Sequence, residues 1–301
     1  MTSAQPSPAW IANKQVLITG ATSGIGRAAA LELASRGAQL NVIARDQAKA
    51  RALADEIAQI SNSTSVRFFH ADLADLDEVR TVAKTIGSEL GPIDILVNNA
   101  GVAARWPRVT TEGRDEMLTA NYLGPFVLTH LLLDQVLAAS PARIVITGSE
   151  AHRMTGPFDA ERFEHLGQYS GLAAQLAYGR TKLLDILFAD ELAARLAGTG
   201  VTVNSFCPGL VSTGLTRDVP GADRLGRLLS ATPLIRTPKQ GARMLIHLAA
   251  DAEVDGVTGR FWTSTPGLGL LPAVAARRHP AVAERVYRRT CDLVGIKELT
   301  A

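Results

Sequence analysis

The sequence predicts an α/β fold of the doubly wound type, with helices on both faces of a central parallel sheet. Short β-branched runs alternate with longer stretches of helical period through the first half of the chain, which is typical of βαβ units. Each run is apolar on both faces, as expected of strands that lie between two layers of helices. A glycine-rich turn follows the first run and opens the first helical stretch. We therefore expect a single domain built on βαβ units.

The expected strands and helices follow in order along the chain. The strands are QVLIT (15–19), QLNVIA (39–44), SVRFFH (65–70), IDILVN (93–98), RIVITG (143–148), VTVNSF (201–206) and TGRFW (258–262). A helix is expected over 25–36, ending in a left-handed cap at Gly37, and another begins near Gly171. Capping-box patterns predict two further helix starts, at Asp75 with Glu78 and at Thr237 with Gln240.

A chain of 301 residues is long enough for one large domain. We expect residues 14–264 to form it, preceded by an N-terminal extension at 1–13 and followed by a C-terminal extension at 265–301 that packs on the same domain. Two stretches break the periodic pattern, 152–176 and 210–236, and we expect them to border the substrate.

Composition and charge argue against several classes of protein. A formal charge of +2 does not suggest a nucleic-acid partner, and the arginines near the C-terminus are expected on a solvated helix face. Cys207 and Cys291 are too few for a disulfide framework and lack metal-ligand spacing. No segment reads as a signal peptide or as a spanning helix. We expect a cytoplasmic protein with no metal, no nucleic acid and no membrane span.

The turn at 19–26 reads TGATSGIG and lies between the first strand and the first helix. Glycines at this place let the backbone approach a pyrophosphate, and the helix N-terminus offers unpaired N–H groups to the anion. The sequence therefore predicts a Rossmann-type dinucleotide site. Its expected residues are Gly20, Thr22, Ser23, Gly24, Ile25 and Gly26.

Arg45 follows the second strand, at the place where an acidic residue would bind the ribose 2′-hydroxyl of NAD. A guanidinium suits the 2′-phosphate of NADP through paired, charge-assisted hydrogen bonds. Asp46 comes next in the chain and could neutralise part of that charge. The sequence favours NADP(H) over NAD(H).

Tyr178 and Lys182 are four positions apart in a helical stretch, so both project from one face of the helix. An ammonium close to a phenol favours the phenolate and lowers the pKa of the tyrosine from about 10 toward the working pH. Such a tyrosine can give or take a proton.

Further short motifs accompany these residues in order: Asn98-Asn99-Ala100-Gly101 after the fourth strand, Asn121, Ser149 after the fifth strand, and Pro208-Gly209 after the sixth. With the glycine turn and the segment from Tyr178 to Lys182, they resemble the short-chain dehydrogenase/reductase family over residues 14–262. The resemblance implies an NADP(H)-dependent enzyme that interconverts an alcohol and a carbonyl, with direct hydride transfer to or from nicotinamide C4.

The resemblance also implies a role for each matched residue. Tyr178 would act as the general acid in reduction and the base in oxidation, and Ser149 would polarise the substrate oxygen. Lys182 would lower the tyrosine pKa and hold the nicotinamide ribose, and Asn121 would anchor a water that relays the proton. The cofactor contacts implied in the same way, besides Tyr178 and Lys182, are Asp72 and Leu73 beside the adenine, Asn99, Ala100 and Gly101 in the cleft, and Pro208, Gly209, Val211 and Thr213 around the carboxamide.

Within the family, the closest likeness is to the retinol dehydrogenase group. It rests on the segments ELASRGAQLNVIARD and NYLGPFVLTHLLL, on the Ala151-His152 pair and on the stretch from Arg285 to Ile296. Members of that group typically carry a membrane-anchoring N-terminal segment that this sequence does not show, so we do not carry over a retinoid substrate. His152 is expected to be structural.

Two features depart from the family pattern, Glu150 and the long segment 152–176. Glu150 either adds negative charge beside the substrate or faces a neighbouring helix, and we favour the second. The long segment is expected to form a wall of the substrate pocket with Met154, Phe158, Phe163, Leu166 and Tyr169. An apolar wall favours a hydrophobic alcohol, aldehyde or ketone, unless these residues only pack the segment onto the core.

Two other functions remain open at this point. An NAD-linked sugar-nucleotide epimerase or dehydratase also uses a tyrosine and a lysine four apart, but its glycines are usually closer together than Gly20 and Gly24. A non-catalytic NADP(H) sensor or scaffold commonly loses one of the two side chains, and this chain has both. The resemblance allows a homo-oligomer formed through helices at 112–138 and 171–197, a surface that the C-terminal extension would cover or replace.

Overall fold

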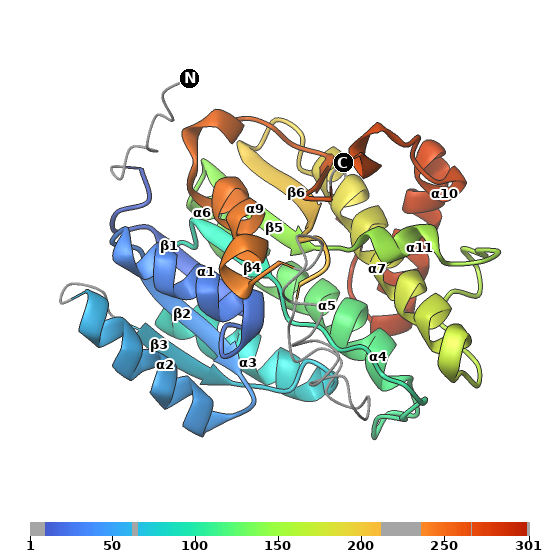
Figure 1. Ribbon diagram of the computed structural model, residues 1–301, viewed down its shortest axis with the longest axis horizontal. Helices are drawn as coiled ribbons and strands as arrows, with labels where there is room; N and C mark the ends of the chain where they lie inside the picture. Colours follow the sequence, from blue (N-terminus) through green and yellow to red (C-terminus); the bar gives the residue numbers. More distant parts are fainter. Residues whose placement is uncertain (1–9, 62–65, 212–235, 266, 300–301) are drawn as a thin grey trace.

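Seven parallel strands form one sheet in the order β3-β2-β1-β4-β5-β6-β7 (Figure 1). The computed structural model describes residues 10–61, 66–211, 236–265 and 267–299. The strands are β1 (Gln15–Thr19), β2 (Gln39–Ala44), β3 (Val66–His70), β4 (Ile95–Asn98), β5 (Ala142–Thr147), β6 (Val201–Cys207) and β7 (Arg260–Thr263). The expected bounds are met in β1 and β2 and differ by one or two residues at an end elsewhere. The predicted doubly wound parallel sheet is confirmed.

Side chains alternate between the two faces of the sheet and enter two hydrophobic clusters. Val16 and Ile18 of β1 lie in the cluster with α1 (Gly24–Ser35), α2 (Gln47–Ile60) and α9 (Pro238–Ala250). Leu17, between them, lies in the other cluster, with α3 (Leu76–Glu89), α5 (Gly124–Leu131) and α7 (Gly171–Arg195). Because helices cover both faces, the strands are apolar on both.

Two of the expected helix ends are confirmed, and the third, at α3, is confirmed only in part. Gly37 has φ 88°, the left-handed cap that ends α1. Thr237 and Gln240 form the complete capping box of α9. At α3, the Asp75 carboxylate accepts from the first backbone N–H groups, but the Glu78 carboxylate turns to the backbone N–H of Asp72, 2.7 Å away.

The chain reverses its direction across the sheet at β1, which has β2 on one side and β4 on the other. In open α/β sheets, ligands bind outside the carboxyl ends of the strands at this switch point. The segments that follow β1 and β4 meet there.

The polypeptide between β4 and β5 is helical but irregular. It contains α4 (Glu116–Leu118), a π-helical turn η1 (Thr119–Leu123), α5 and α6 (Leu133–Ala138). Pro125 stands in the first turn of α5 and has no N–H to donate to the carbonyl of Asn121, four residues earlier. π-Turns of this kind occur frequently at functional sites.

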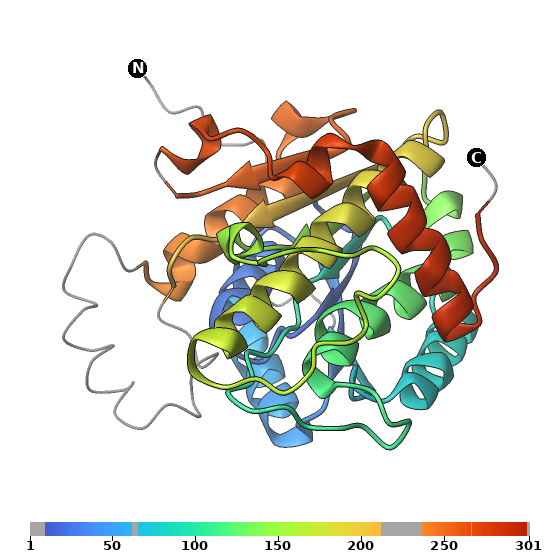
Figure 2. The same cartoon turned by 90° about the vertical axis from the view of Figure 1, so that its right-hand side faces the viewer.

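The C-terminal helix packs against α5 and α7. α10 (Ala275–Arg278) leads into α11 (Pro280–Val294), and Figure 2 shows α11 in red beside the yellow α7. Two buried polar contacts join it to the preceding helices: the hydroxyls of Tyr122 and Thr290 are 2.6 Å apart, and His130 Nε2 lies 2.7 Å from the Tyr287 hydroxyl. Part of the surface considered for an oligomer is thus covered by the chain itself.

The remaining short elements are the 3-10 helices η2 (Glu150–Arg153), η4 (Ala252–Val254) and η5 (Leu268–Leu270). Within the described ranges, no helix is both long enough and apolar enough to cross a bilayer.

Thr290→Val is expected to destabilise the protein by about 1–3 kcal/mol. The Thr290 hydroxyl donates to the Val286 carbonyl and therefore accepts from the fully buried Tyr122 hydroxyl, which would lose its acceptor. Chemical denaturation measures the change. Thr85→Val, at a helical threonine on the surface of α3 whose hydroxyl bonds its own helix, is the control and should change stability by much less. Equal losses in both variants would contradict the role of the buried contact.

Candidate active site

The glycine turn after β1 is shaped by close backbone contacts. Gly20 and Gly24 have φ of 68° and 54°, which favour glycine. A β-carbon on Gly26 would run into the Gly20 carbonyl oxygen and the Asn99 amide. A β-carbon on Gly20 would lie 2.7 Å from Cα of Ala100. All three glycines are therefore required for the turn to pack against the segment after β4.

The segment after β4 is tied to this turn by hydrogen bonds. The Thr19 hydroxyl accepts from the backbone N–H groups of Asn99 and Ala100, each at 3.0 Å. The Asn99 amide donates to the carbonyls of Thr19 and Gly20, at 3.1 and 3.3 Å. The two loops at the switch point therefore form one rigid surface.

The residues of this surface fit a dinucleotide. Ser23 is the N-cap of α1 but makes no side-chain capping bond, so the first N–H groups of the helix are free of a side-chain cap. Together with the helix dipole, such groups attract a pyrophosphate. Gly20 and Gly26 keep β-carbons out of the cradle, as an approaching pyrophosphate requires.

The structure gives Arg45 a different acidic partner from the one considered in the sequence. Its guanidinium donates to Asp72 Oδ2 at 3.0 Å, and the Arg45 side chain is 58% exposed. Asp46 instead caps α2 by accepting from the backbone N–H of Lys49 and pairs with the Lys49 ammonium, and these bonds lower the pKa of the Asp46 carboxyl. Arg45 is thus held beside Asp72 at the end of β2 and remains open to solvent. Leu73 has its side chain in the core.

Tyr178, Lys182 and Ser149 come together at the carboxyl end of β5. The Lys182 ammonium lies 5.9 Å from the centre of the Tyr178 ring and donates to the Thr147 carbonyl at 3.0 Å. The Ser149 hydroxyl lies near enough to Tyr178 to lower the tyrosine pKa. Ser149 is thus brought together with two residues of α7 that are far from it in sequence, and the three form one polar cluster.

Gly179 explains how Ser149 reaches Tyr178. Ser149 caps η2, and its hydroxyl accepts from the backbone N–H of Ala151 at 3.1 Å. A β-carbon on Gly179 would collide with the backbone carbonyls of Ala151 and Met154. The glycine that follows Tyr178 thus lets η2 lie directly on α7.

The net effect of the surroundings on Tyr178 is opposite to the expected one. Tyr178 is only partly exposed, and its burial raises its pKa. The Lys182 charge and the Ser149 hydroxyl lower it. The charge of Asp185 adds to the rise. Without a cofactor in the cleft, the tyrosine is therefore held in its protonated form.

Asn121 lies inside the π-turn and uses its side chain structurally. Its Oδ1 accepts from the backbone N–H of Val102 at 2.7 Å, and its Nδ2 donates to the Val102 carbonyl at 2.9 Å and to the Thr181 hydroxyl at 3.0 Å. Pro125, four residues later, has no N–H to donate to the main-chain carbonyl of Asn121. A β-carbon on Gly101 would lie 3.4 Å from Asn121 Oδ1 and 3.5 Å from Lys182 Nζ, so this glycine keeps the site open.

The residues after β6 border the same end of the sheet. Gly209 has φ 84° and donates its N–H to the Cys207 sulfur at 3.4 Å. Val211 forms a β-bridge with Arg236 and its side chain lies against Gly241 of α9. Thr213 and most of the predicted stretch 210–236 lie outside the described residues.

A small apolar cluster lies beside Tyr178. The loop after β4, α4, the segment before α7 and α7 itself contribute to it: Val102, Ala104, Met117, Leu166, Tyr169, Ala174 and Ala177. Leu166 and Tyr169 were expected in such a wall. Phe163 was wrongly assigned there, because it is buried in the large core cluster, edge-on to Tyr122.

Other residues of the long segment pack away from this cluster or into solvent. Phe158 packs against the large core cluster, and the Met154 side chain is 48% exposed. Glu150 accepts from Arg153 at 2.7 Å, and Arg153 reaches the carbonyls of Leu268 and Pro272. Glu150 therefore serves the attachment of the C-terminal segment. His152 is fully buried against Phe261.

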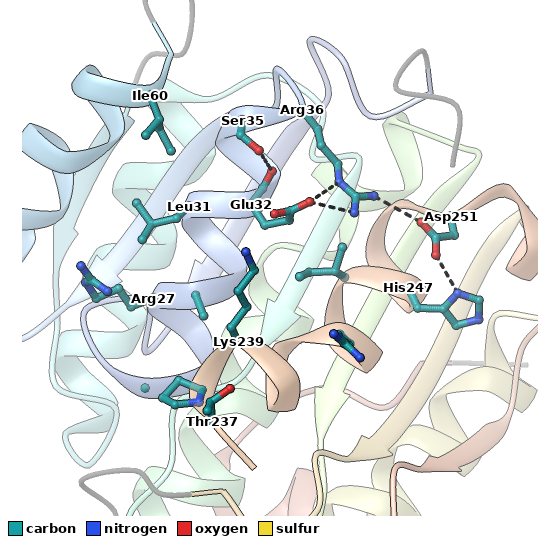
Figure 3. Close-up of a pocket in the computed structure, with 15 residues that line it drawn as sticks. Arg27, Leu31, Glu32, Ser35, Arg36, Ile60, Thr237, Lys239, His247 and Asp251 are labelled. Carbon is teal, nitrogen blue, oxygen red and sulfur yellow. Dashed lines mark hydrogen bonds and ion pairs between the residues drawn. The ribbon is translucent and has the colours of Figure 1, made fainter. Parts of the chain in front are cut away.

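A separate hollow of about 780 Å³ lies between α1 and α9 (Figure 3). On one side, Arg36 pairs with Glu32 and Asp251, and Asp251 also contacts His247. Neither Ser149 nor Tyr178 nor Lys182 lines this hollow. It therefore does not mark the site of the polar cluster.

One residue of the site was missed in the sequence. The Asp185 carboxylate lies 2.8 Å from the Lys182 ammonium, and both side chains are 4% exposed. The missed signal is a lone carboxylate in the otherwise apolar run LLDILF (183–188), since a buried acid needs a partner. Three positions before it, on the same helix, stands the lysine.

Comparisons with known proteins agree with this arrangement. The family model described as short chain dehydrogenase matches residues 14–160. Mouse (Mus musculus) retinol dehydrogenase 12 is 36% identical over 95% of this chain and 88% of its own, and human (Homo sapiens) retinol dehydrogenase 13 is 38% identical over 97% and 88%. The crystal structure of a short chain dehydrogenase from Burkholderia cenocepacia in complex with NADP has a TM-score of 0.66 and 26% identity, over 84% of this chain and 96% of that one.

Gly26→Ala is expected to weaken NADPH binding by at least tenfold, because the new methyl group must push the Gly20 carbonyl and the Asn99 amide out of the cradle. Gly91→Ala is the control, since a β-carbon there has open space around it. NADPH fluorescence titration of both variants gives the two affinities. Unchanged binding in Gly26→Ala would show that the turn does not hold the dinucleotide.

Proposed function

Because the chain belongs to the short-chain dehydrogenase/reductase family of oxidoreductases, in its retinol dehydrogenase-like group, we propose that it uses NADP(H) to interconvert a hydrophobic alcohol with its aldehyde or ketone. The observation that carries the proposal is the convergence of Ser149, Tyr178 and Lys182 beside the glycine turn. A bound nicotinamide would supply or accept the hydride.

The polar cluster supplies the proton chemistry of this reaction. In reduction, the Ser149 and Tyr178 hydroxyls bind the carbonyl oxygen, where negative charge develops as the hydride arrives. Tyr178 then gives its proton to that oxygen, and in oxidation it takes the proton back. Lys182, fixed by the Thr147 carbonyl, stabilises the phenolate formed in between.

The phenolate must be reprotonated from solvent after each reduction. The Asn121 main-chain carbonyl, to which Pro125 has no N–H to donate, is a suitable anchor for a relaying water near Lys182. The side chain of Asn121 holds the π-turn in place through Val102 and Thr181. In this proposal, Asn121 serves the proton path through its backbone.

Arg45 supports the proposed preference for NADP(H). It stands at the end of β2, is largely exposed, and Asp72 fixes its position. A 2′-phosphate would replace water around a guanidinium that is already oriented. A similar structure with bound NADP agrees with this preference.

The apolar cluster beside Tyr178 supports a hydrophobic substrate. Val102, Met117 and Leu166 present no charge to the reacting oxygen. Retinol dehydrogenases are among the similar proteins, which makes long apolar alcohols and aldehydes the first substrates to test.

The complete set of Ser149, Tyr178 and Lys182 speaks against a sensor without activity. The cytoplasmic location and the homo-oligomer remain predictions.

Tyr178→Phe is expected to lower turnover at least a thousandfold, since it removes the group that transfers the proton. NADPH binding should change little, because the ring and Lys182 remain. Turnover is followed by NADPH absorbance with apolar aldehydes, ketones and retinoids, and binding by fluorescence. Activity near that of the wild type would contradict the proposed mechanism.

Arg45→Asp should weaken NADPH binding by roughly a hundredfold and NADH binding by much less, because it replaces attraction to the 2′-phosphate with repulsion. Lys84→Asp, at an exposed cation on α3, controls for the change in overall charge. Equal losses for both cofactors in Arg45→Asp would show that Arg45 does not contact the 2′-phosphate.

A further inference from the structure

We infer that Asp185 is a positioning residue for the proton transfer: it holds the Lys182 ammonium in place, and its negative charge offsets the ammonium charge that would otherwise favour the Tyr178 phenolate. This inference rests on the proposed function and deepens it. It concerns the protonation state that Tyr178 holds when no cofactor lies in the cleft.

The contacts of Lys182 carry the positioning part of the inference. An ammonium has three N–H donors. One goes to the Thr147 carbonyl at 3.0 Å and one to Asp185 Oδ2 at 2.8 Å. The third is left for the side on which Tyr178 and Gly101 lie. Asp185 and Thr147 thus fix the direction in which the ammonium can act.

The burial of Lys182 and Asp185 supports the second part of the inference, that the charge of Asp185 acts on Tyr178. Both side chains are 4% exposed, in a run where Leu184, Ile186 and Leu187 are also buried. Water therefore screens neither charge well. Burying two charges gains little stability by itself, because the desolvation cost offsets their attraction. An apolar pair would serve the fold as well, which points to a role of Asp185 in the site.

Among the described residues, the groups with the strongest effect on the pKa of Tyr178 come from three places in the fold. Lys182 and Asp185 lie on α7, Cys207 on β6 and Ser149 at the end of β5. Lys182 and Ser149 lower the pKa of Tyr178, whereas burial, Asp185 and Cys207 raise it. Tyr122, on η1, also feels the Asp185 charge but remains neutral because burial raises its pKa.

Asp185 must be ionised to act in this way. Burial raises the pKa of the Asp185 carboxyl to about 6, and the Lys182 ammonium holds it below what burial alone would give. Lys182 remains protonated, because Asp185 and Tyr178 outweigh the effect of its burial and raise its pKa. At neutral pH the pair is therefore ionised, and Asp185 offsets much of the positive charge that would otherwise favour the Tyr178 phenolate.

The decisive experiment is a phenolate titration of the cofactor-free protein by near-ultraviolet absorbance. The chain has four tyrosines. Burial raises the pKa of Tyr122, Tyr169 and Tyr287 as well, so the Tyr178 transition has to be separated from theirs. The Tyr178→Phe variant supplies the baseline and identifies the transition.

Asp185→Asn is expected to move the Tyr178 transition to lower pH. At a pH well below the wild-type midpoint, where little phenolate is present, the phenolate fraction should increase roughly tenfold. Asp190→Asn is the matched control on the same helix, because its carboxylate pairs with Arg277 and not with Lys182. It should leave the transition unmoved. If Asp185→Asn does not fold, Asp185→Ser, with a smaller neutral side chain, is titrated in its place.

A transition at the same or a higher pH in the neutral Asp185 variants would overturn the inference. In active protein, turnover is also measured against pH. In Asp185→Asn, the alkaline limb of the pH profile of reduction and the rising limb of the pH profile of oxidation should move to lower pH together. This test is separate from that of the proposed function. An active Tyr178→Phe variant refutes the function while the titration still reports on Asp185, and an unmoved titration refutes the inference even if Tyr178→Phe is inactive.

Discussion

The buried ammonium of Lys182 is the interaction on which the site depends. It is almost without contact to water, and the Thr147 carbonyl and the Asp185 carboxylate hold it at the end of β5. From there it acts on the phenol of Tyr178, one helical turn earlier on α7. A flexible surface lysine would have neither the fixed direction nor the strength in a medium of low polarity. The geometry of proton transfer follows from this one charge.

The sheet and its close contacts bring the other partners to that charge. The strand order reverses at β1. There, the loops after β1 and β4 are hydrogen-bonded to each other through Thr19 and Asn99. Gly179 lets η2 lie against α7, so that Ser149 meets Tyr178. The dinucleotide surface and the proton donor therefore occupy neighbouring positions on one rigid frame.

Much of this frame could be predicted from sequence, because its signals are local. β-Branched runs bounded by turns placed the strands, and the capping box at Thr237 placed α9. What could not be predicted depends on which of several partners a side chain meets in three dimensions. Arg45 pairs with Asp72 and not with its neighbour, Phe163 packs in the core, and Asp185 pairs with Lys182. The π-turn at Asn121 likewise depends on contacts with the distant Val102.

Transfer of deuterium is the most direct test of the central claim, that this site moves a hydride and a proton to a carbonyl. Purified protein is given NADPH deuterated at the transferable C4 position together with an apolar aldehyde, and the product is analysed by mass spectrometry. We expect the product alcohol to carry one deuterium on the carbinol carbon. Tight binding of the cofactor with no labelled alcohol from any apolar aldehyde, ketone or retinoid would contradict it.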